Sequence, residues 1–462
     1  MTGRSTRTLG SVAVILGAAF AGSGCGAAAK DSTPAAAPPR SAQAADVCGT
    51  YSGRGCAPRA RRVDLVEPSF SNPTQVTNPL FPIAKLRSAI LLGNVEGVPL
   101  RVETTLLPGA KTIDLGGREV KALASQYVAF LGGRIEEVAL DWYAQADDGS
   151  VWYLGEDVFN YAHGTIEDTE GTWLAGREGP AAMIMPGQPR VGDVFRPENV
   201  PGIIFEEVSV KATGRTVTGP RGRLEGGIVT DELHLDGTHE DKTFAPGYGE
   251  FSTGSKGDLE ALALAVPTDA LPGPPPAAVE RLGASAIGIL GSARAEDWKA
   301  SSATLRRMKA DWHGLRTGQV PPMLRAQMDR ALERLGRAVR ARRPLRAALA
   351  AIDTAQAGLD LELRHRPVPA VDLDRFDLWA SRVLVHAAAG DREGVTGDVA
   401  TLEWIRDRIA HVLDPAGLRE LDARLRDLRG VADLGNVRSA ADHAARLAAR
   451  LRELAPPQGH LR

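Results

Sequence analysis

One stretch of the sequence combines aromatic rings and carboxylates at a density that suits ligand binding. Its candidate ligand-binding residues are Asp141, Tyr143, Tyr153, Glu156 and Asp157. Aromatic faces beside carboxylates bind sugars, cationic ligands or peptides. Alternatively, Asp141, Glu156 or Asp157 could act as acid and base in an envelope hydrolase; glycoside hydrolysis requires two carboxyl groups about 5–10 Å apart. The ordinary alternative is that the rings pack the core and the carboxylates serve turns and caps.

These residues lie on a predicted β-hairpin. The Asp148-Gly149 pair is a common hairpin turn, and runs of alternating apolar and polar residues flank it. Successive side chains of a strand point to opposite faces, so Asp141 and Tyr143 share one face and Trp142 takes the other. We expect Trp142 to pack inward and Asp141 and Tyr143 to face the possible site.

Two groups of residues in the same half of the chain are candidate metal ligands. His234, Asp236 and His239 surround a predicted turn, and a hairpin there could direct both imidazoles toward one ion. A polar turn is the ordinary alternative. Met183 and Met185 are two residues apart and would share one face of a strand, where their thioethers could bind copper as soft ligands. The alternative is that both are buried residues of a core strand.

A weak repeat in the second half of the chain suggests a third ligand pair. Trp379 and His386, and again Trp404 and His411, are seven residues apart and would share a helix face. Two such helices could bring the histidines together as metal or haem ligands. Packing of each tryptophan beside one hydrogen-bonded imidazole is the alternative.

Familiar catalytic motifs are absent from the sequence. It contains no GxSxG, SxxK or HExxH motif, no Walker loop, and no GxGxxG placed between a strand and a helix. We therefore expect binding rather than catalysis, with no cofactor. The net charge of −2 gives no field that would favour nucleic acid as a partner.

The N-terminus has the pattern of an export signal. Arg4 and Arg7 precede a short apolar run at 9–21, and small residues lead to Cys25. The segment resembles a bacterial lipobox, which implies that Cys25 becomes the lipidated first residue, although Gly22 stands where the pattern prefers an aliphatic residue. We expect a lipid anchor on the outer face of the cell membrane. Ordinary secretion is the alternative.

The other two cysteines, Cys48 and Cys56, flank a short glycine-rich loop. Disulfides persist outside the cytoplasm, so this close pair is predicted to form a structural disulfide. A redox-active pair would have CxxC spacing, which this pair lacks.

The elements that must position these residues fall into two classes. Turn signals and alternating runs predict an antiparallel β domain, barrel-like or a curved meander. The turn signals are Gly132-Gly133, Asp148-Gly149, Asp236-Gly237 and Pro246-Gly247. Beyond a proline-rich stretch, Ala, Leu and Arg at helical spacing predict six to eight antiparallel helices in one or two bundles. Helix breaks are expected at Pro321-Pro322, Pro344, Pro367 to Pro369, Gly390-Asp391 and Asp414-Pro415. The expected order is a signal peptide (1–24), a tether with the disulfide loop (25–62), the β domain (63–267), a linker (268–276) and the helical domain (277–455).

Several spaced sequence blocks resemble a family of exported, lipoprotein-like proteins of high-GC Gram-positive bacteria that has no established activity. The resemblance covers Pro68 to Val266 and implies an extracytoplasmic β domain, without transferring any catalytic residue. The GDVATLEW block at 397–404 is similar to exported helical proteins of the same bacteria. The blocks are NPLFP (78–82), DWYAQ (141–145), VWYLGED (151–157), GTWLAG (171–176), MIMP (183–186) and PGYGE (246–250).

The favoured interpretation is a non-enzymatic lipoprotein of the cell envelope. Its β domain would bind a ligand, and its helical domain would bind an envelope protein or polymer. The membrane itself is contacted through the N-terminal lipid. The two alternatives are the carboxylate-dependent hydrolase and an extracytoplasmic metal-binding protein.

Overall fold

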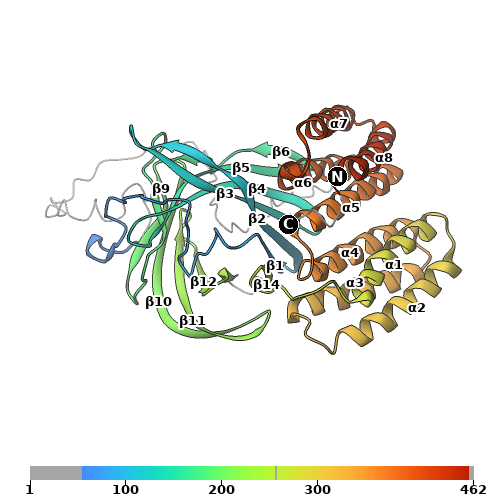
Figure 1. Cartoon of the computed structure of the whole chain (residues 1–462), viewed down its shortest axis with the longest axis horizontal. Helices are drawn as coiled ribbons and strands as arrows, with labels where there is room; N and C mark the ends of the chain where they lie inside the picture. The colour runs from blue at the N-terminus through green and yellow to red at the C-terminus, as the bar shows by residue number, and fades with distance from the viewer. Residues whose placement is uncertain (1–54, 255–257, 457–462) are drawn as a thin grey trace, which may run out of the picture.

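A computed structural model describes residues 55–254 and 258–456. Within them, a 14-stranded antiparallel sheet precedes eight α-helices, so the predicted α+β class is confirmed (Figure 1). The strands are β1 (Ser88–Val95), β2 (Val98–Asp114), β3 (Glu119–Leu131), β4 (Arg134–Gln145), β5 (Val151–Ala162), β6 (Thr165–Asp168), β7 (Trp173–Leu174), β8 (Ala182–Met185), β9 (Val194–Val200), β10 (Ile204–Gly219), β11 (Gly222–His234), β12 (His239–Ala245), β13 (Gly249–Gly254) and β14 (Leu259–Val266).

The sheet is a curved meander. Its strand order is β6-β5-β4-β3-β2-β1-β14-β13-β12-β11-β10-β9, and β7 and β8 pair with β5. The ends of this path do not pair with each other, so the sheet is open, but β8 also lies against β9. The sheet therefore curls around a concave face, which we call the interior.

Turn residues determine where the strands reverse. The predicted turns at Gly132-Gly133, Asp148-Gly149, Asp236-Gly237 and Pro246-Gly247 all lie between consecutive paired strands. The glycines in these turns have positive φ, a backbone conformation that costs glycine little.

Five of the seven boundaries between the described helices lie at predicted breaks, and those between α1 and α2 and between α7 and α8 were not predicted. Proline occupies the first turn of α3, α4, α5 and α7, where its missing N–H costs no hydrogen bond. Asp391 and Asp414 cap α6 and α7 by accepting hydrogen bonds from backbone N–H groups. The helices are α1 (Ala277–Arg294), α2 (Trp298–Leu315), α3 (Pro322–Arg340), α4 (Pro344–Glu362), α5 (Val368–Ala389), α6 (Arg392–Ile409), α7 (Pro415–Asp433) and α8 (Val437–Leu454).

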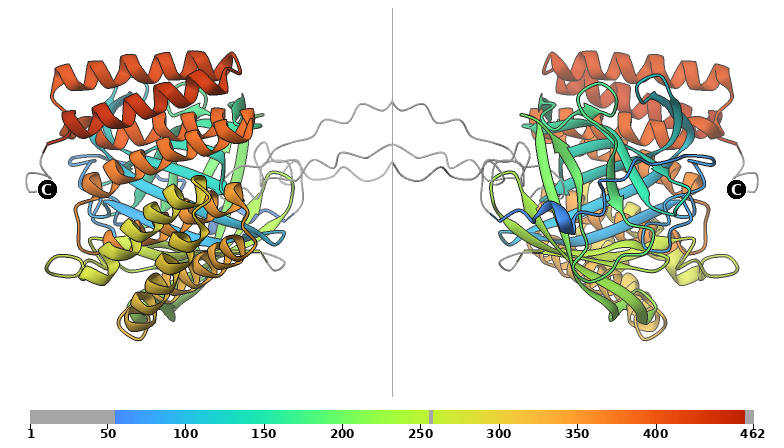
Figure 2. Two further views of the ribbon diagram at one scale, coloured as in Figure 1. Left: turned by 90° about the vertical axis from the view of Figure 1, so that its right-hand side faces the viewer. Right: turned by 90° about the vertical axis from the view of Figure 1, so that its left-hand side faces the viewer.

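Two four-helix groups cover the outer face of the sheet. Helices α1–α4 share a core with Ile90 and Leu264 of β1 and β14. Helices α5–α8 form a second core, and α6 packs against β4. Figure 2 shows the helices in front of the sheet from one side and the strands uncovered from the opposite side. The α-helices of the described part of the chain thus lie on the side of the sheet away from the interior.

Buried ion pairs join the helices to the outer face of the sheet. Arg101 of β2 binds Asp360 of α4 through two hydrogen bonds of 2.6 and 2.8 Å. Glu103, also on β2, accepts a hydrogen bond from Arg408 of α6, and Arg375 of α5 binds Asp360 at 3.0 Å. We call Arg101, Glu103, Asp360, Asp372, Arg375 and Arg408 the interface network; it contains three cations and three carboxylates.

Candidate functional site

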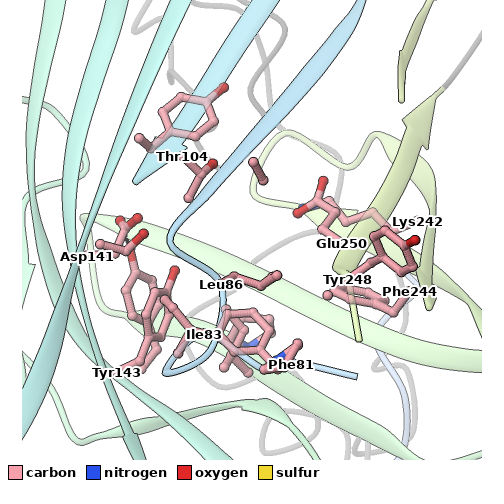
Figure 3. Close-up of a pocket in the computed structure, with 18 of the residues that line it drawn as sticks. Phe81, Ile83, Leu86, Thr104, Asp141, Tyr143, Lys242, Phe244, Tyr248 and Glu250 are labelled. Carbon is pink, nitrogen blue, oxygen red and sulfur yellow. Dashed lines mark hydrogen bonds between the residues drawn. The ribbon is translucent and has the colours of Figure 1, made fainter. Parts of the chain in front are cut away.

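A cavity of about 140 Å³ lies in the interior, between opposite parts of the curved sheet. Figure 3 shows Asp141 and Tyr143 on one wall and Lys242, Phe244, Tyr248 and Glu250 on the wall facing them. Apolar side chains from the segment before β1 and from β1, β2 and β8–β10 complete it, among them Phe81, Ile83, Leu86, Leu91, Leu106, Ile184, Phe195 and Val208.

The first wall is aromatic. Tyr143 and Tyr153 are cross-strand partners on β4 and β5, and their rings stack with centroids 4.8 Å apart. Phe81 meets Tyr143 edge to face at 4.9 Å. The Tyr153 hydroxyl donates a 2.8 Å hydrogen bond to Asp141, which orients that carboxyl group within the wall.

A bulge in β5 decides which carboxyl groups face the interior. Asp141 pairs with Glu156 while Tyr143 pairs with Tyr153, so β5 has one extra residue between these pairs. Gly155 lies in this bulge with φ of +117°, and a Cβ there would come within 2.3 Å of the Trp173 carbonyl oxygen. The extra residue turns Glu156 to the same side as Asp141.

The bulge also separates Asp157 from the other predicted site residues. Asp157 points to the outer face, is partly exposed, and lies 4.0 Å from Lys111. The same Lys111 covers Trp142, with its ammonium 3.0 Å from the ring centroid. Trp142 is therefore buried on the face opposite to Asp141 and Tyr143, which are buried as well and line an internal cavity.

The cavity lining carries an excess of carboxyl groups. Among the described residues, five carboxylic side chains and one lysine line it: Asp141, Glu206, Glu232, Glu250, Glu260 and Lys242. Lys242 lies 2.6 Å from Glu232. Glu260 is 4% exposed, and neither of its oxygens accepts a hydrogen bond from any described residue. Lys242 thus pairs with Glu232, and His234 beside the cavity pairs with Glu206, which leaves Glu260 without a hydrogen-bond partner among the described residues.

The pKa values of three cavity acids are raised, in keeping with this excess of carboxyl groups. Burial raises the pKa of Asp141 to about 7, although the tyrosine hydroxyls lower it. Burial and the neighbouring Glu206 raise the pKa of Glu232 to about 7. Burial and Glu250 raise the pKa of Glu260 well above its usual value. Near neutral pH the cavity therefore holds protonated carboxyl groups that a nearby cation would ionise.

Glu156 lies in the interior beside a second acid. It is buried next to Glu198 of β9, which accepts a hydrogen bond from the Trp173 indole at 3.1 Å. Burial and the neighbouring Glu198 raise the pKa of Glu156 well above its usual value. Thus the structure brings together Asp141, Tyr143 and Tyr153 in the cavity lining, with Glu156 on the same face.

The structure does not bring the predicted histidine ligands together. His234 faces the interior, with Nδ1 3.2 Å from Glu206. His239 lies on the other face of the sheet, half exposed and 3.0 Å from Asp231. Asp236 accepts hydrogen bonds from Thr238 within the turn. The cross-strand pairing of Leu233 with His239 explains the separation, because it puts His234 on the opposite face.

The helical histidines have separate surroundings. His386 Nδ1 lies 2.7 Å from Asp398, whereas His411 lies in a short 3-10 turn after α6. The tryptophans of the same repeat pack on the sheet: Trp379 stacks on Phe130 at 5.2 Å and Trp404 contacts Phe159 at 5.0 Å. Met183 and Met185 are buried in the apolar core beside β5.

The N-terminal predictions fall mostly outside the described residues. Cys25 and Cys48 both precede residue 55, so lipidation and the disulfide stay predictions. Cys56 is described, and it packs against Phe205 and Leu233. Among the described residues, no helix combines the length and apolar character needed to cross a membrane.

Comparison with known proteins adds no relative. The sequence matches no protein-family model, and no curated protein matches it significantly.

Proposed function

We propose that the chain is an exported, lipid-anchored and non-enzymatic protein whose curved sheet binds a small cationic molecule with an apolar body. The observation that supports this most is the cavity lining of five carboxyl groups, one lysine and a wall of aromatic rings. Buried charges are retained when they are paired, and a bound cation would supply the missing partner.

The two walls suit the two parts of such a ligand. An ammonium group beside Glu260 would give its carboxylate the partner that the described residues do not provide. The apolar body would lie against Phe81, Tyr143 and Phe244, whose rings also attract cations. The cavity of about 140 Å³ resembles in size an engineered cavity of about 150 Å³ in another protein that binds benzene. A phenyl-sized group therefore fits.

Acid–base hydrolysis is the second candidate function. Asp141 and Glu156 share the interior face, and both have raised pKa values, as a general acid requires. Asp157 does not belong to this pair because it faces outward. Turnover of a chromogenic glycoside that disappears in both Asp141→Asn and Glu156→Gln would favour this function over binding.

Titration calorimetry with a matched pair of probes tests the binding proposal. 2-Phenylethylamine and 3-phenylpropanoate share an aromatic body but have opposite charges. We expect the amine to bind and the carboxylate not to bind. Glu260→Gln should weaken amine binding by roughly tenfold or more, since it removes a charged partner. Asp157→Asn, on the outer face, is the matched control and should bind normally.

Equal affinity for the two probes, or equal effects of the two substitutions, would contradict the proposal.

The lipid anchor is tested separately, by membrane fractionation of the Cys25→Ser variant. The variant should be released in folded form, and its retention with membranes at the parental level would refute lipid anchoring.

A further inference from the structure

A second polar centre lies beside the cavity, on β10 and β11. Glu206, Glu232 and His234 can each offer one ligand atom such that all three atoms lie within 4.8 Å of one another. The three residues are 1%, 2% and 6% exposed. Glu206 and His234 are direct cross-strand partners, and Glu232 lies two residues before His234 on the same face. Two paired strands therefore hold the three side chains in fixed relation.

Two ligand atoms of this centre are paired with each other. Glu206 Oε1 and His234 Nδ1 are both buried and form an ion pair at 3.2 Å. Ligand atoms bound to one zinc ion at about 2.0–2.2 Å in tetrahedral geometry are about 3.3–3.6 Å apart. The separation of these two atoms thus suits adjacent ligands of one ion.

We infer that Glu206, Glu232 and His234 bind a divalent transition-metal ion such as Zn²⁺. Two carboxylates and one imidazole are a donor set that suits such an ion, and three protein ligands leave a coordination position open. Glu206 and Glu232 also line the cavity, so the open position faces it. This inference does not depend on the proposed amine ligand.

The surroundings of the three ligands support the assignment. The other ring nitrogen of His234, Nε2, lies 3.7 Å from Glu240. A carboxylate behind a ligating histidine fixes the ring orientation and is a common feature of metal sites. Lys242 lies 2.6 Å from Glu232, whose two oxygens allow it to contact both the ammonium group and an ion.

The hairpin itself provides a matched pair of variants. His234 and His239 are five residues apart on adjacent strands but lie on opposite faces of the sheet. The purified full chain, freed of metal, should bind one Zn²⁺ per molecule in titration calorimetry. His234→Ala should weaken binding by at least about 100-fold, whereas His239→Ala should leave it unchanged.

Cobalt provides an independent readout. Co²⁺ added in place of Zn²⁺ should give visible absorption typical of tetrahedral coordination, and His234→Ala should abolish it. If His234→Ala fails to fold by circular dichroism, Glu206→Gln takes its place with the same expectation. Absence of Zn²⁺ binding at micromolar concentration, or equal losses in His234→Ala and His239→Ala, would overturn the inference.

Discussion

Two of the regions that bury charge differ in their balance of positive and negative groups. The interface network pairs three arginines with three carboxylates between the helices and the outer face of the sheet. The cavity lining, on the other face, has five carboxyl groups and one lysine. Balanced charge joins two parts of a fold, whereas unbalanced charge costs stability and fits a site that receives a cation. The comparison thus separates a structural region from a candidate functional one.

The pKa of Glu103 in the interface network and the pKa values of Asp141 and Glu260 in the cavity are shifted in opposite directions. Burial alone would raise the pKa of Glu103, but Arg375, Arg101 and Arg408 hold it well below its usual value. In the cavity, burial raises the pKa of Asp141 to about 7, and burial together with the nearby Glu250 raises the pKa of Glu260 well above its usual value. Glu103 therefore stabilises the fold as an ion, and Asp141 and Glu260 destabilise it once they ionise.

The largest expected effect is at the interface network. Glu103→Gln removes the charge that faces Arg375 and Arg408 and should lower the free energy of unfolding by about 3–5 kcal/mol. Urea denaturation at pH 7 measures this loss. The control is Glu333→Gln, which breaks an exposed pair with Arg337 and should change little. Similar losses in the two variants would show that the network does not stabilise the fold.

The second prediction concerns pH. Asp141 has a raised pKa in the folded protein, so its unfavourable contribution begins above its unfolded value of about 3.9 and is complete above about 7. Asp141→Asn, which keeps an oxygen for the Tyr153 hydroxyl, should therefore be more stable than the parent at pH 8.

Urea denaturation of the parent and of Asp141→Asn from pH 4 to pH 8 measures how their difference in free energy of unfolding changes with pH. The advantage of Asp141→Asn should grow as the pH rises to about 7 and then stay constant. Glu103 should behave oppositely, because its stabilisation is present above its unfolded pKa and is lost as the pH falls toward its lowered folded pKa. An advantage of Asp141→Asn that shrinks with rising pH would contradict the comparison.

A smaller effect is expected where a neutral pair joins helix and sheet. The Trp404 indole on α6 donates a 2.8 Å hydrogen bond to the Tyr161 hydroxyl on β5. Trp404→Phe should cost about 1 kcal/mol for this bond, in addition to the packing volume lost. A double-mutant cycle with Tyr161→Phe isolates the bond, and a coupling energy near zero would rule out its contribution.

The smallest effect is expected at Asp157. This side chain lies on the outer face and is partly exposed, so Asp157→Asn should change the free energy of unfolding by less than about 0.5 kcal/mol. Thermal unfolding measures the change. A large loss would mean that the bulge at Gly155 does not separate Asp157 from the interior acids.

Local signals predicted the order of elements well. Proline and Asp-Pro or Gly-Asp pairs predicted the helix ends, since they act on the neighbouring backbone alone. Alternation along β4 correctly predicted that Asp141 and Tyr143 oppose Trp142. The bulge in β5 was not predicted. Without it, regular alternation from Tyr153 would put Glu156 on the outer face of the sheet. The positive φ of Gly155 depends on contact with Trp173, which the sequence does not reveal.

Ion pairs between residues far apart in the chain could not be predicted from the sequence either. Arg101 and Asp360 are 259 residues apart, and Glu103 and Arg408 are 305 apart. The facing wall of the cavity was missed as well, although Glu232 and His234 alternate with apolar neighbours. The available signal was that these acids share a strand face with apolar residues, which indicates burial. The sequence does not reveal the curvature of the sheet, which brings Glu260 and Asp141 into the lining of one cavity.

The most direct test of the account measures protons released when a cation binds. Calorimetric titration of the protein with 2-phenylethylamine at pH 7, repeated in two buffers of different ionisation enthalpy, gives the number of protons exchanged. An ammonium group entering the cavity should lower the raised pKa values of Asp141 and its neighbours and release protons to the buffer. The account predicts net release in the parent and a smaller release in Asp141→Asn. Binding without proton release, or no binding of the amine at millimolar concentration, would contradict it.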